Sequence, residues 1–229
     1  MSPNDLKHLD GLTVPTLANA VELFGVEAPN RGFTREPLTC HFPSFGNCIG
    51  YAVTVHARTD QEVKGFDEHE YWKWLEAHPG PKVVVVEDLD RVPGGAMWGE
   101  WNANVHLALG CVGTVTQGAV RDLDALERLH FHAFSTSVSV AHGYGVFVEY
   151  NEPATVAGLT VHTGELLVAD LHGVLRIPHE IPLAELADVA RTIDRLESEV
   201  FAFCQSTEFT VDGLARIQDD VLARWPKPR

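Results

Sequence analysis

The chain has 229 residues, and its 45% hydrophobic and 21% charged residues are typical of a globular protein rather than a disordered or fibrous one. Its 32 acidic residues outnumber its 17 lysines and arginines, which gives a formal net charge of −15. This charge argues against nucleic acid and anionic membranes as partners, because nothing would offset the repulsion from phosphate.

The first predicted elements lie on either side of an irregular loop. A helix is expected from Val14 to Phe24, with Thr13 as its cap and Pro15 in its first turn. The loop is expected at about 28–47. Further predicted elements are strands at 49–57, 82–87 and 111–116, and helices at about 68–77, 99–109 and 122–129. Four consecutive valines in the strand at 82–87 predict burial on both of its faces.

The second half of the chain is predicted to begin with strands and end with helices. The expected strands lie at about 131–140, 146–150, 153–157, 166–170 and 173–177, and the expected helices at about 183–206 and 211–224. Alternating strands and helices followed by a strand-rich segment predict an α/β fold with a mixed sheet. No linker marks a second domain, so we expect a single domain over 1–229 with a C-terminal helical extension from about 183.

The cysteines and the N-terminus favour a cytoplasmic protein. The first five residues lack the basic and apolar regions of a signal peptide, and no apolar run approaches the ~20 residues that span a bilayer. Four cysteines form no CxxC pair, so we expect reduced and mostly buried thiols.

The segment with the most chemical content follows the strand at 111–116. There a turn containing Gly118 leads to Arg121 and Asp122 at the start of a helix. Such loops at the carboxyl ends of strands are where open α/β sheets bind ligands. Arg121 offers a planar pair of donors suited to a carboxylate. Asp122 is suited either to a hard divalent cation or to capping the helix at 123–129.

Two glutamates also have alternative interpretations. Glu100 is either a first-turn acid favoured by the helix dipole or a site residue. Glu197 lies within the apolar stripe of the late helix, whereas Glu199 points away from it. An acid on such a stripe needs a partner, so Glu197 either forms an ion pair across a subunit contact or enters a neighbour's active site.

Three segments resemble the RraA-like family. The run from Glu100 to Asp122, with Arg121 and its glycines, is similar to the family signature. The segment 161–174 is similar to the family hairpin V-x-P-G-D-L-V-x-A-D-x-D-G-V, and 13–22 to its first helix. The family includes divalent-metal aldolases of 4-hydroxy-4-methyl-2-oxoglutarate and 4-carboxy-4-hydroxy-2-oxoadipate, which also decarboxylate oxaloacetate, and the regulator of ribonuclease activity A.

The resemblance implies a three-layer β/β/α swivelling fold, a trimer or hexamer, and an active site between subunits. Asp122 would hold Mg²⁺ or Mn²⁺, and Arg121 would bind the carboxylate or keto oxygen of a small anionic 2-oxo acid. Glu100 would hold metal-bound water, and Glu197 would come from the adjacent subunit. The amides of Gly99, Glu100, Trp101 and Asn102 would bind the substrate carboxylate.

The chain departs from the family pattern at positions near this site. Glu100 replaces the usual Asp, and Ala125 stands where an acid is usual. The stretch from His142 to Tyr144 replaces one that often contains proline, and Trp98 and Trp101 are expected near the mouth of the site. These departures affect the choice of substrate more than that of metal.

Two other functions remain open. One is a non-catalytic regulator that binds a protein partner, although the long C-terminal helix with Glu197 is more similar to the aldolases. The other is a metal-dependent lyase or dehydratase of a hydroxylated sugar acid. In that case His106, His142 and Tyr144 would supply further acid–base groups, although packing and turn roles also account for them.

Overall fold

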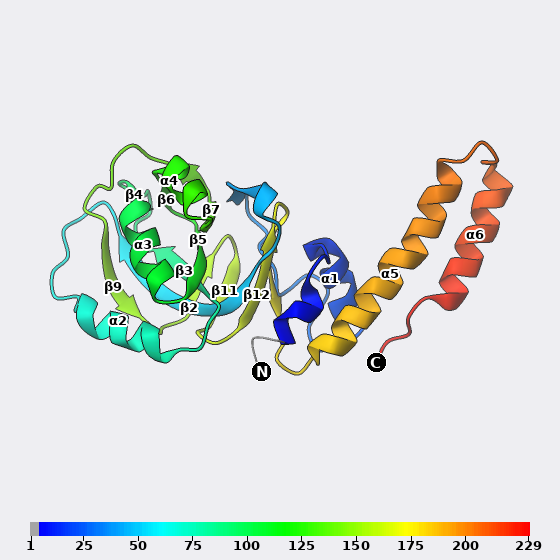
Figure 1. Ribbon diagram of the computed structural model, residues 1–229, viewed down its shortest axis with the longest axis horizontal. Helices are drawn as coiled ribbons and strands as arrows, with labels where there is room; N and C mark the ends of the chain where they lie inside the picture. The colour runs from blue at the N-terminus through cyan, green and yellow to red at the C-terminus, as the bar shows by residue number, and fades with distance from the viewer. Residues whose placement is uncertain (1–4) are drawn as a thin grey trace. The chain divides into compact units, whose positions relative to one another are not determined.

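The computed structural model describes residues 5–229 and divides the chain into two compact units (Figure 1). One unit is Asn30–His179, and the other combines the chain up to Pro29 with the chain from Glu180 onward. The boundary at Glu180 lies near the predicted start of the helical extension, while the single domain over 1–229 stays a prediction, and its residues 1–4 lie outside the described part.

The unit Asn30–His179 is built on an eight-stranded mixed sheet with the order β1-β7-β5-β3-β2-β12-β13, in which β9 also pairs with β2. Its strands are β1 (Thr39–Cys40), β2 (Cys48–Arg58), β3 (Lys82–Asp88), β5 (Cys111–Thr116), β7 (His132–Ser135), β9 (Val146–Tyr150), β12 (Leu166–Asp170) and β13 (Gly173–Ile177). Strands β2, β3, β5 and β7 run parallel, and the other pairings are antiparallel. The predicted mixed sheet is therefore confirmed, and β12 and β13 form the hairpin that the family pattern implied.

Helices cover one face of this sheet and a β-hairpin covers the other (Figure 1). The helices are α2 (Glu68–Ala77), α3 (Glu100–Ala108) and α4 (Leu123–Arg128), and the hairpin strands are β10 (Ala154–Val156) and β11 (Leu159–Val161). A short 3₁₀ turn, η2 (Pro43–Phe45), follows β1. The α/β class and the three layers expected from the resemblance are thus confirmed.

The four valines of β3 separate the two halves of the core. Val84 and Val86 pack among the helix-side residues, whereas Val83 and Val85 pack against the hairpin side. All four are at most 1% exposed, so the predicted burial on both faces is confirmed. Successive side chains of a strand alternate between faces, which is why an uninterrupted apolar run is needed here.

The expected strand at 131–140 is wrong in part, because it is two strands in two sheets. After β7 the chain turns at Thr136, whose hydroxyl donates to the carbonyl of Gln117 at 2.6 Å. It then forms β8 (Ser137–Val138), which pairs with β6 (Ala119–Val120), and β6 pairs with β4 (Ala96–Trp98). These strands of two or three residues carry too little sequence pattern to be predicted, and they pair only once the main sheet brings their ends together.

The other unit is helical and contains η1 (Asp5–Leu9), α1 (Val14–Glu22), α5 (Leu183–Cys204) and α6 (Val211–Arg224). The hydroxyl of Thr13 accepts the N–H of Thr16 at 3.3 Å, so the predicted cap is confirmed. The predicted apolar stripe of α5 is buried from Leu186 to Leu196. No helix within residues 5–229 combines the length and apolar character needed to cross a membrane.

Candidate active site

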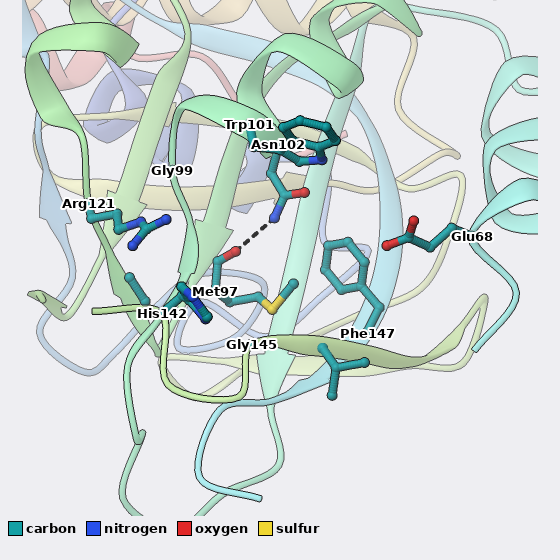
Figure 2. A pocket seen from close by; sticks show the side chains of 11 residues that line it. Glu68, Met97, Gly99, Trp101, Asn102, Arg121, His142, Gly145 and Phe147 are labelled. Atoms are coloured by element: carbon teal, nitrogen blue, oxygen red, sulfur yellow. Dashed lines mark hydrogen bonds between the residues drawn. The ribbon is translucent and has the colours of Figure 1, made fainter. Parts of the chain in front are cut away.

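A pocket of about 230 Å³ lies within the unit Asn30–His179 (Figure 2). Its walls come from β4, the first turn of α3, the end of β6, the start of α2, and the chain entering β9. The lining residues are Glu68, Ala96, Met97, Gly99, Trp101, Asn102, Arg121, His142, Gly145, Val146 and Phe147. Four of the predicted site residues, Gly99, Trp101, Asn102 and Arg121, are therefore brought together.

Arg121 enters the pocket from the end of β6. Its backbone N–H donates to the carbonyl of Trp98 at 2.8 Å, which fixes its position beside β4. About a third of its side chain is exposed, and Figure 2 shows the guanidinium on one side of the pocket. A guanidinium that is partly exposed at a pocket wall can bind an incoming carboxylate with two N–H groups.

Asp122 stands beside Arg121 and caps a helix other than its own. Its Oδ2 accepts the backbone N–H of Glu100, the first residue of α3, at 3.0 Å, and lies 3.5 Å from Nε of Arg121. Asp122 occupies the N-cap position of α4, as predicted, but its side chain makes no capping bond there. The reason is its left-handed backbone, with φ 54° and ψ 41°, whereas a capping residue normally has extended angles.

Gly99 makes this arrangement possible by leaving space. A Cβ at this position would lie 2.6 Å from Oδ2 of Asp122 and 3.0 Å from Cγ of Arg121. The backbone of Gly99 is extended, with φ −158°, so sterics rather than backbone conformation require the glycine. Gly99 itself provides no side-chain cap for α3, and Asp122 supplies that contact from another segment.

The carboxylate of Glu100 is not part of the pocket lining. One of its oxygens lies 3.8 Å from Arg128 of α4, and more than half of the side chain is exposed. Its predicted role in holding a metal-bound water stays a prediction. The contact with Arg128 and the dipole of α3 already account for an acid at this position.

The two tryptophans have different environments. Trp101 lines the pocket and is 77% exposed, as expected of a residue at the mouth. The expectation for Trp98 is wrong, because it is fully buried among the helix-side core residues and stacks on Phe131. Trp98 is the last residue of β4, and its side chain packs on the helix side of the core although it directly precedes Gly99.

A divalent cation at this site would have few protein ligands, and the carboxylate of Asp122 would be one of them. Within residues 5–229, no three His, Cys, Asp or Glu side chains gather in a cluster that could hold a metal ion. Asp122 offers a 40% exposed carboxylate, of which one oxygen is committed to the N–H of Glu100. Mg²⁺ commonly uses one or two carboxylates and keeps several waters, so Asp122 fits such an ion.

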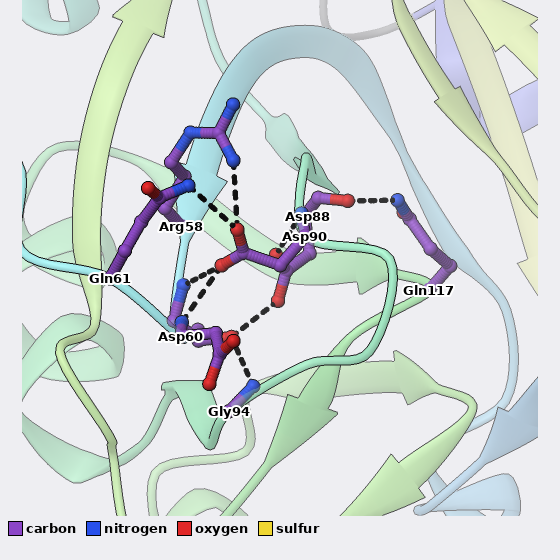
Figure 3. Close-up of polar contacts among 8 residues, drawn as sticks. Arg58, Asp60, Gln61, Asp88, Asp90, Gly94 and Gln117 are labelled. Atoms are coloured by element: carbon purple, nitrogen blue, oxygen red, sulfur yellow. Dashed lines mark hydrogen bonds and ion pairs between the residues drawn. The ribbon is translucent and has the colours of Figure 1, made fainter.

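A polar network secures the loop that leads into β4 (Figure 3). The carboxylate of Asp90 accepts the N–H groups of Thr59 at 2.6 Å and Asp60 at 2.8 Å, and a side-chain N–H of Arg58 at 2.8 Å. Burial opposes the charge of Asp90, but these donors lower its pKa. The buried end of β2 is thereby joined to the loop after β3.

The same network reaches the pocket wall through Thr59. Its hydroxyl donates to Asp88 at 2.8 Å and accepts the N–H of Gly94 at 2.9 Å, while its carbonyl accepts the N–H of Tyr144 at 2.9 Å. Burial raises the pKa of Asp88. A Cβ at Gly143, where φ is +58°, would lie 2.3 Å from the carbonyl of Thr59. The segment that carries His142 into the pocket is thus fixed by close backbone packing.

His106 is a core residue rather than a pocket residue. Its Nδ1 donates to the carbonyl of Asn102 at 2.7 Å, so Nε2 is left to accept the hydroxyl of Tyr71 at 2.9 Å. Burial lowers its pKa to about 4. Of the three additional acid–base candidates, His142 alone lines the pocket, and Tyr144 is 59% exposed.

The two late-helix acids, Glu197 and Glu199, lie on α5 in the helical unit. Glu199 accepts two N–H groups of Arg224 on α6, at 3.1 and 2.5 Å, and pairs with Arg195. Glu197 is half-buried on α5. Its predicted approach to the active site of a neighbouring copy stays a prediction.

The sequence reasoning missed Glu68, Met97 and Phe147 as pocket residues. Glu68 follows the helix cap Asp67 and has the pattern of an ordinary first-turn acid. Met97 lies on a strand too short to be predicted, and Phe147 is one of many apolar strand residues. Nothing in their local sequence indicates a pocket.

Comparisons with curated proteins give low but extended similarity. Protein DlpA of Legionella pneumophila is 26% identical over 180 residues, which are 78% of this chain and 28% of that protein. A protein of Halalkalibacterium halodurans named "Putative 4-hydroxy-4-methyl-2-oxoglutarate aldolase" is 30% identical over 127 residues, which are 55% of this chain and 60% of that protein. The chain therefore spans less than two thirds of each of these relatives.

Solved structures share the fold. A protein from Pseudomonas syringae pv. tomato matches with a TM-score of 0.70 and 22% identity, covering 95% of this chain and 98% of its own. RraAS2 of Streptomyces coelicolor matches with a TM-score of 0.66 and 18% identity, covering 88% and 96%. The family model described as RraA-like, Aldolase/RraA, matches residues 15–176. Since that match spans most of the chain, this protein belongs to the RraA-like family.

Proposed function

We propose that this protein is a divalent-metal-dependent lyase that cleaves a carbon–carbon bond of a small 2-oxo acid. The observation that carries the proposal is the pairing of Asp122 and Arg121, 3.5 Å apart, at the N-terminus of α3. It places an exposed carboxylate beside a guanidinium that lines a pocket. The relative named as an aldolase supports the same reaction class.

The substrate carboxylate is bound by positive groups of this chain. The guanidinium of Arg121 faces the pocket, and the first-turn N–H groups of Trp101 and Asn102 have no helical carbonyl to bind. These amides and the dipole of α3 favour an anion at this helix end. The side chain of Asn102 donates to the carbonyl of Met97 at 2.8 Å, which fixes the turn in place.

Asp122 is the residue that would hold Mg²⁺ or Mn²⁺. When bound, the cation would draw electron density from the 2-oxo group of the substrate. In a retro-aldol cleavage the C4 hydroxyl gives its proton to water, the C3–C4 bond breaks, C4 becomes a carbonyl, and the bonding electron pair moves into a pyruvate enolate. In oxaloacetate the bond between C3 and the C4 carboxylate breaks instead. CO₂ departs, and the same pyruvate enolate remains. Arg121 stabilises the developing negative charge, and a water protonates C3. Glu100, which the resemblance assigns to that water, would have to turn from Arg128 toward the pocket to orient it.

The assembly expected from the resemblance belongs to the same proposal. Further copies in a trimer or hexamer would bring Glu197 to the pocket of a neighbour. One protomer offers Asp122 beside Arg121, which lines the pocket, and no cluster of three metal-binding side chains in residues 5–229. A second acid from another copy would complete the site.

Substitution of Arg121 and Asp122 tests the proposal. Asp122→Asn keeps an oxygen that accepts the N–H of Glu100 and tolerates the left-handed backbone, so it removes the charge while preserving the fold. We expect Arg121→Ala and Asp122→Asn each to lower the rate of pyruvate formation from oxaloacetate with Mg²⁺ by about 10²–10³-fold or more.

The matched control is Asp124→Asn, which removes an 84% exposed carboxylate that pairs with Arg128. It should leave turnover unchanged. Asp122→Ala also removes the cap of α3 and therefore reports on folding as well as on charge. Full oxaloacetate decarboxylation by the Arg121 or Asp122 variants would reject the assignment. Unchanged turnover after removal of divalent cations with EDTA would reject the metal.

A further inference from the structure

We propose, on the basis of the proposed function, that Glu68 selects 2-oxo acids whose far end carries a hydrogen-bond donor such as a hydroxyl, and disfavours a second carboxylate. One guanidinium and one carboxyl side chain line the pocket, those of Arg121 and Glu68. Their charges have opposite signs, so the pocket treats the two ends of an elongated substrate differently.

The charges stand on opposite sides of the pocket. Figure 2 shows Arg121 on one side and the carboxylate of Glu68 on the other, with Asn102, Met97 and Phe147 between them. A substrate carboxylate bound at Arg121 therefore extends its carbon chain along the apolar surfaces of Met97 and Phe147. Its far end then points toward Glu68.

Glu68 is available for this role because its neighbours supply the local contacts of α2. Asp67 caps the helix by accepting the N–H of Glu70 at 3.1 Å, and the carboxylate of Glu70 pairs with Lys73 at 2.8 Å. Within residues 5–229, Glu68 has no ion-pair partner, and its carboxylate points into the pocket. Glu68 is also exposed to solvent, so an approaching carboxylate would meet a like charge that water and salt screen in part.

Glu68 and Trp101 determine which chemical group the pocket favours at the substrate end far from Arg121. A carboxylate is an acceptor without a proton to donate, so Glu68 repels it and offers it no hydrogen bond. A hydroxyl donates to Glu68 without any charge repulsion. The exposed indole of Trp101 adds a flat surface on which the methylene groups of such a chain can pack.

Two five-carbon substrates that differ only at C5 test the inference. These are 4,5-dihydroxy-2-oxopentanoate, with CH₂OH at C5, and 4-hydroxy-2-oxopentanedioate, with a carboxylate. Retro-aldol cleavage of C3–C4 yields pyruvate from both, together with glycolaldehyde or glyoxylate. The ratio of their kcat/KM values, measured with Mg²⁺, is compared between variants, so that properties intrinsic to the compounds cancel.

We expect Glu68→Gln to shift this ratio toward the dicarboxylate by about tenfold, and Glu68→Lys to shift it further. The shift should come from faster cleavage of the dicarboxylate. Glu70→Gln is the matched control, because it removes the same charge from the same helical turn outside the pocket. It should leave the ratio within about twofold.

An unchanged ratio in both Glu68 variants would overturn the inference while leaving the proposed lyase activity intact. If the wild type cleaves neither compound, the retro-aldol part of the proposed function fails for these substrates, and the inference is judged from calorimetric affinities. A tenfold gain in dicarboxylate affinity in Glu68→Gln would support it. Equal affinities, or no binding of either compound, would overturn it.

Discussion

Arg121 and Asp122 lie close together because the residue beside them, Gly99, has no side chain. Asp122 is held by the N–H of Glu100 and by Arg121, and Gly99 leaves the space in which these groups meet. The left-handed backbone of Asp122 directs its carboxylate to α3 instead of to its own helix. Asp122 thus links the turn after β6 to the first turn of α3, where we propose that the substrate anion binds.

Gly99→Ala should disrupt this link. The added methyl group would meet Oδ2 of Asp122 at 2.6 Å, so the carboxylate must leave the N–H of Glu100. We expect a loss of about 1–2 kcal/mol of stability, as for loss of a helix cap. Turnover should fall by at least tenfold, since both Arg121 and Asp122 are displaced. Thermal unfolding and pyruvate formation measure the two effects, and wild-type values for both would contradict the role assigned to Gly99.

At the level of elements, the loop between β3 and β4 depends on Asp90. Its carboxylate accepts two backbone N–H groups and a side-chain N–H of Arg58. The network then continues through Thr59 to Gly94, just before the strand that carries Met97. Hydrogen bonds therefore hold this loop in place although it forms no helix or strand.

Asp90→Ala should lower the free energy of unfolding by about 1–3 kcal/mol, because it leaves the part-buried donors of Arg58 and Thr59 without this acceptor. Since the loop positions the pocket wall, KM for the 2-oxo acid should rise as well. Urea unfolding and steady-state kinetics provide the measurements. Asp60→Asn is the control, because Asp60 contributes only its backbone N–H to the network. Equal stability of the Asp90 and Asp60 variants would show that the network does not secure the loop.

Most regular elements were predictable because their periodicity is long and clear. The helices at 68–77 and 211–224 and the strands at 111–116 and 146–150 were predicted with the observed ends. The small parallel sheet was not predictable, since its strands have two or three residues each. That sheet positions Met97 and Arg121, so the pocket was less predictable than the scaffold.

At the scale of the folded molecule, two buried histidines tie stability to pH. Burial lowers the pKa of both His106 and His132 to about 4, below the 6.5 of an exposed histidine. Between these values the unfolded chain binds more protons than the folded one, so acidification favours unfolding. Their contribution is fully present above pH 6.5 and is lost as the pH falls toward 4.

His106→Gln should weaken this dependence. Between pH 7 and pH 4 the wild type should lose up to about 3 kcal/mol more of its unfolding free energy than the variant. Denaturant unfolding at a series of pH values measures the difference. The exposed His162 supplies the control, because His162→Gln should preserve the wild-type slope. Parallel curves for wild type and His106→Gln would refute the coupling.

The sequence by itself indicated the class of fold, the main helices and strands and the family, and it singled out Arg121 and Asp122 as candidate site residues. These features depend on local periodicity or on short motifs, which a chain displays without being folded. Only the tertiary structure decided which helix Asp122 caps, that Trp98 is buried, and that Glu68 faces Arg121 across a pocket. Each of these depends on segments distant in the chain whose contacts exist only after the sheet has assembled.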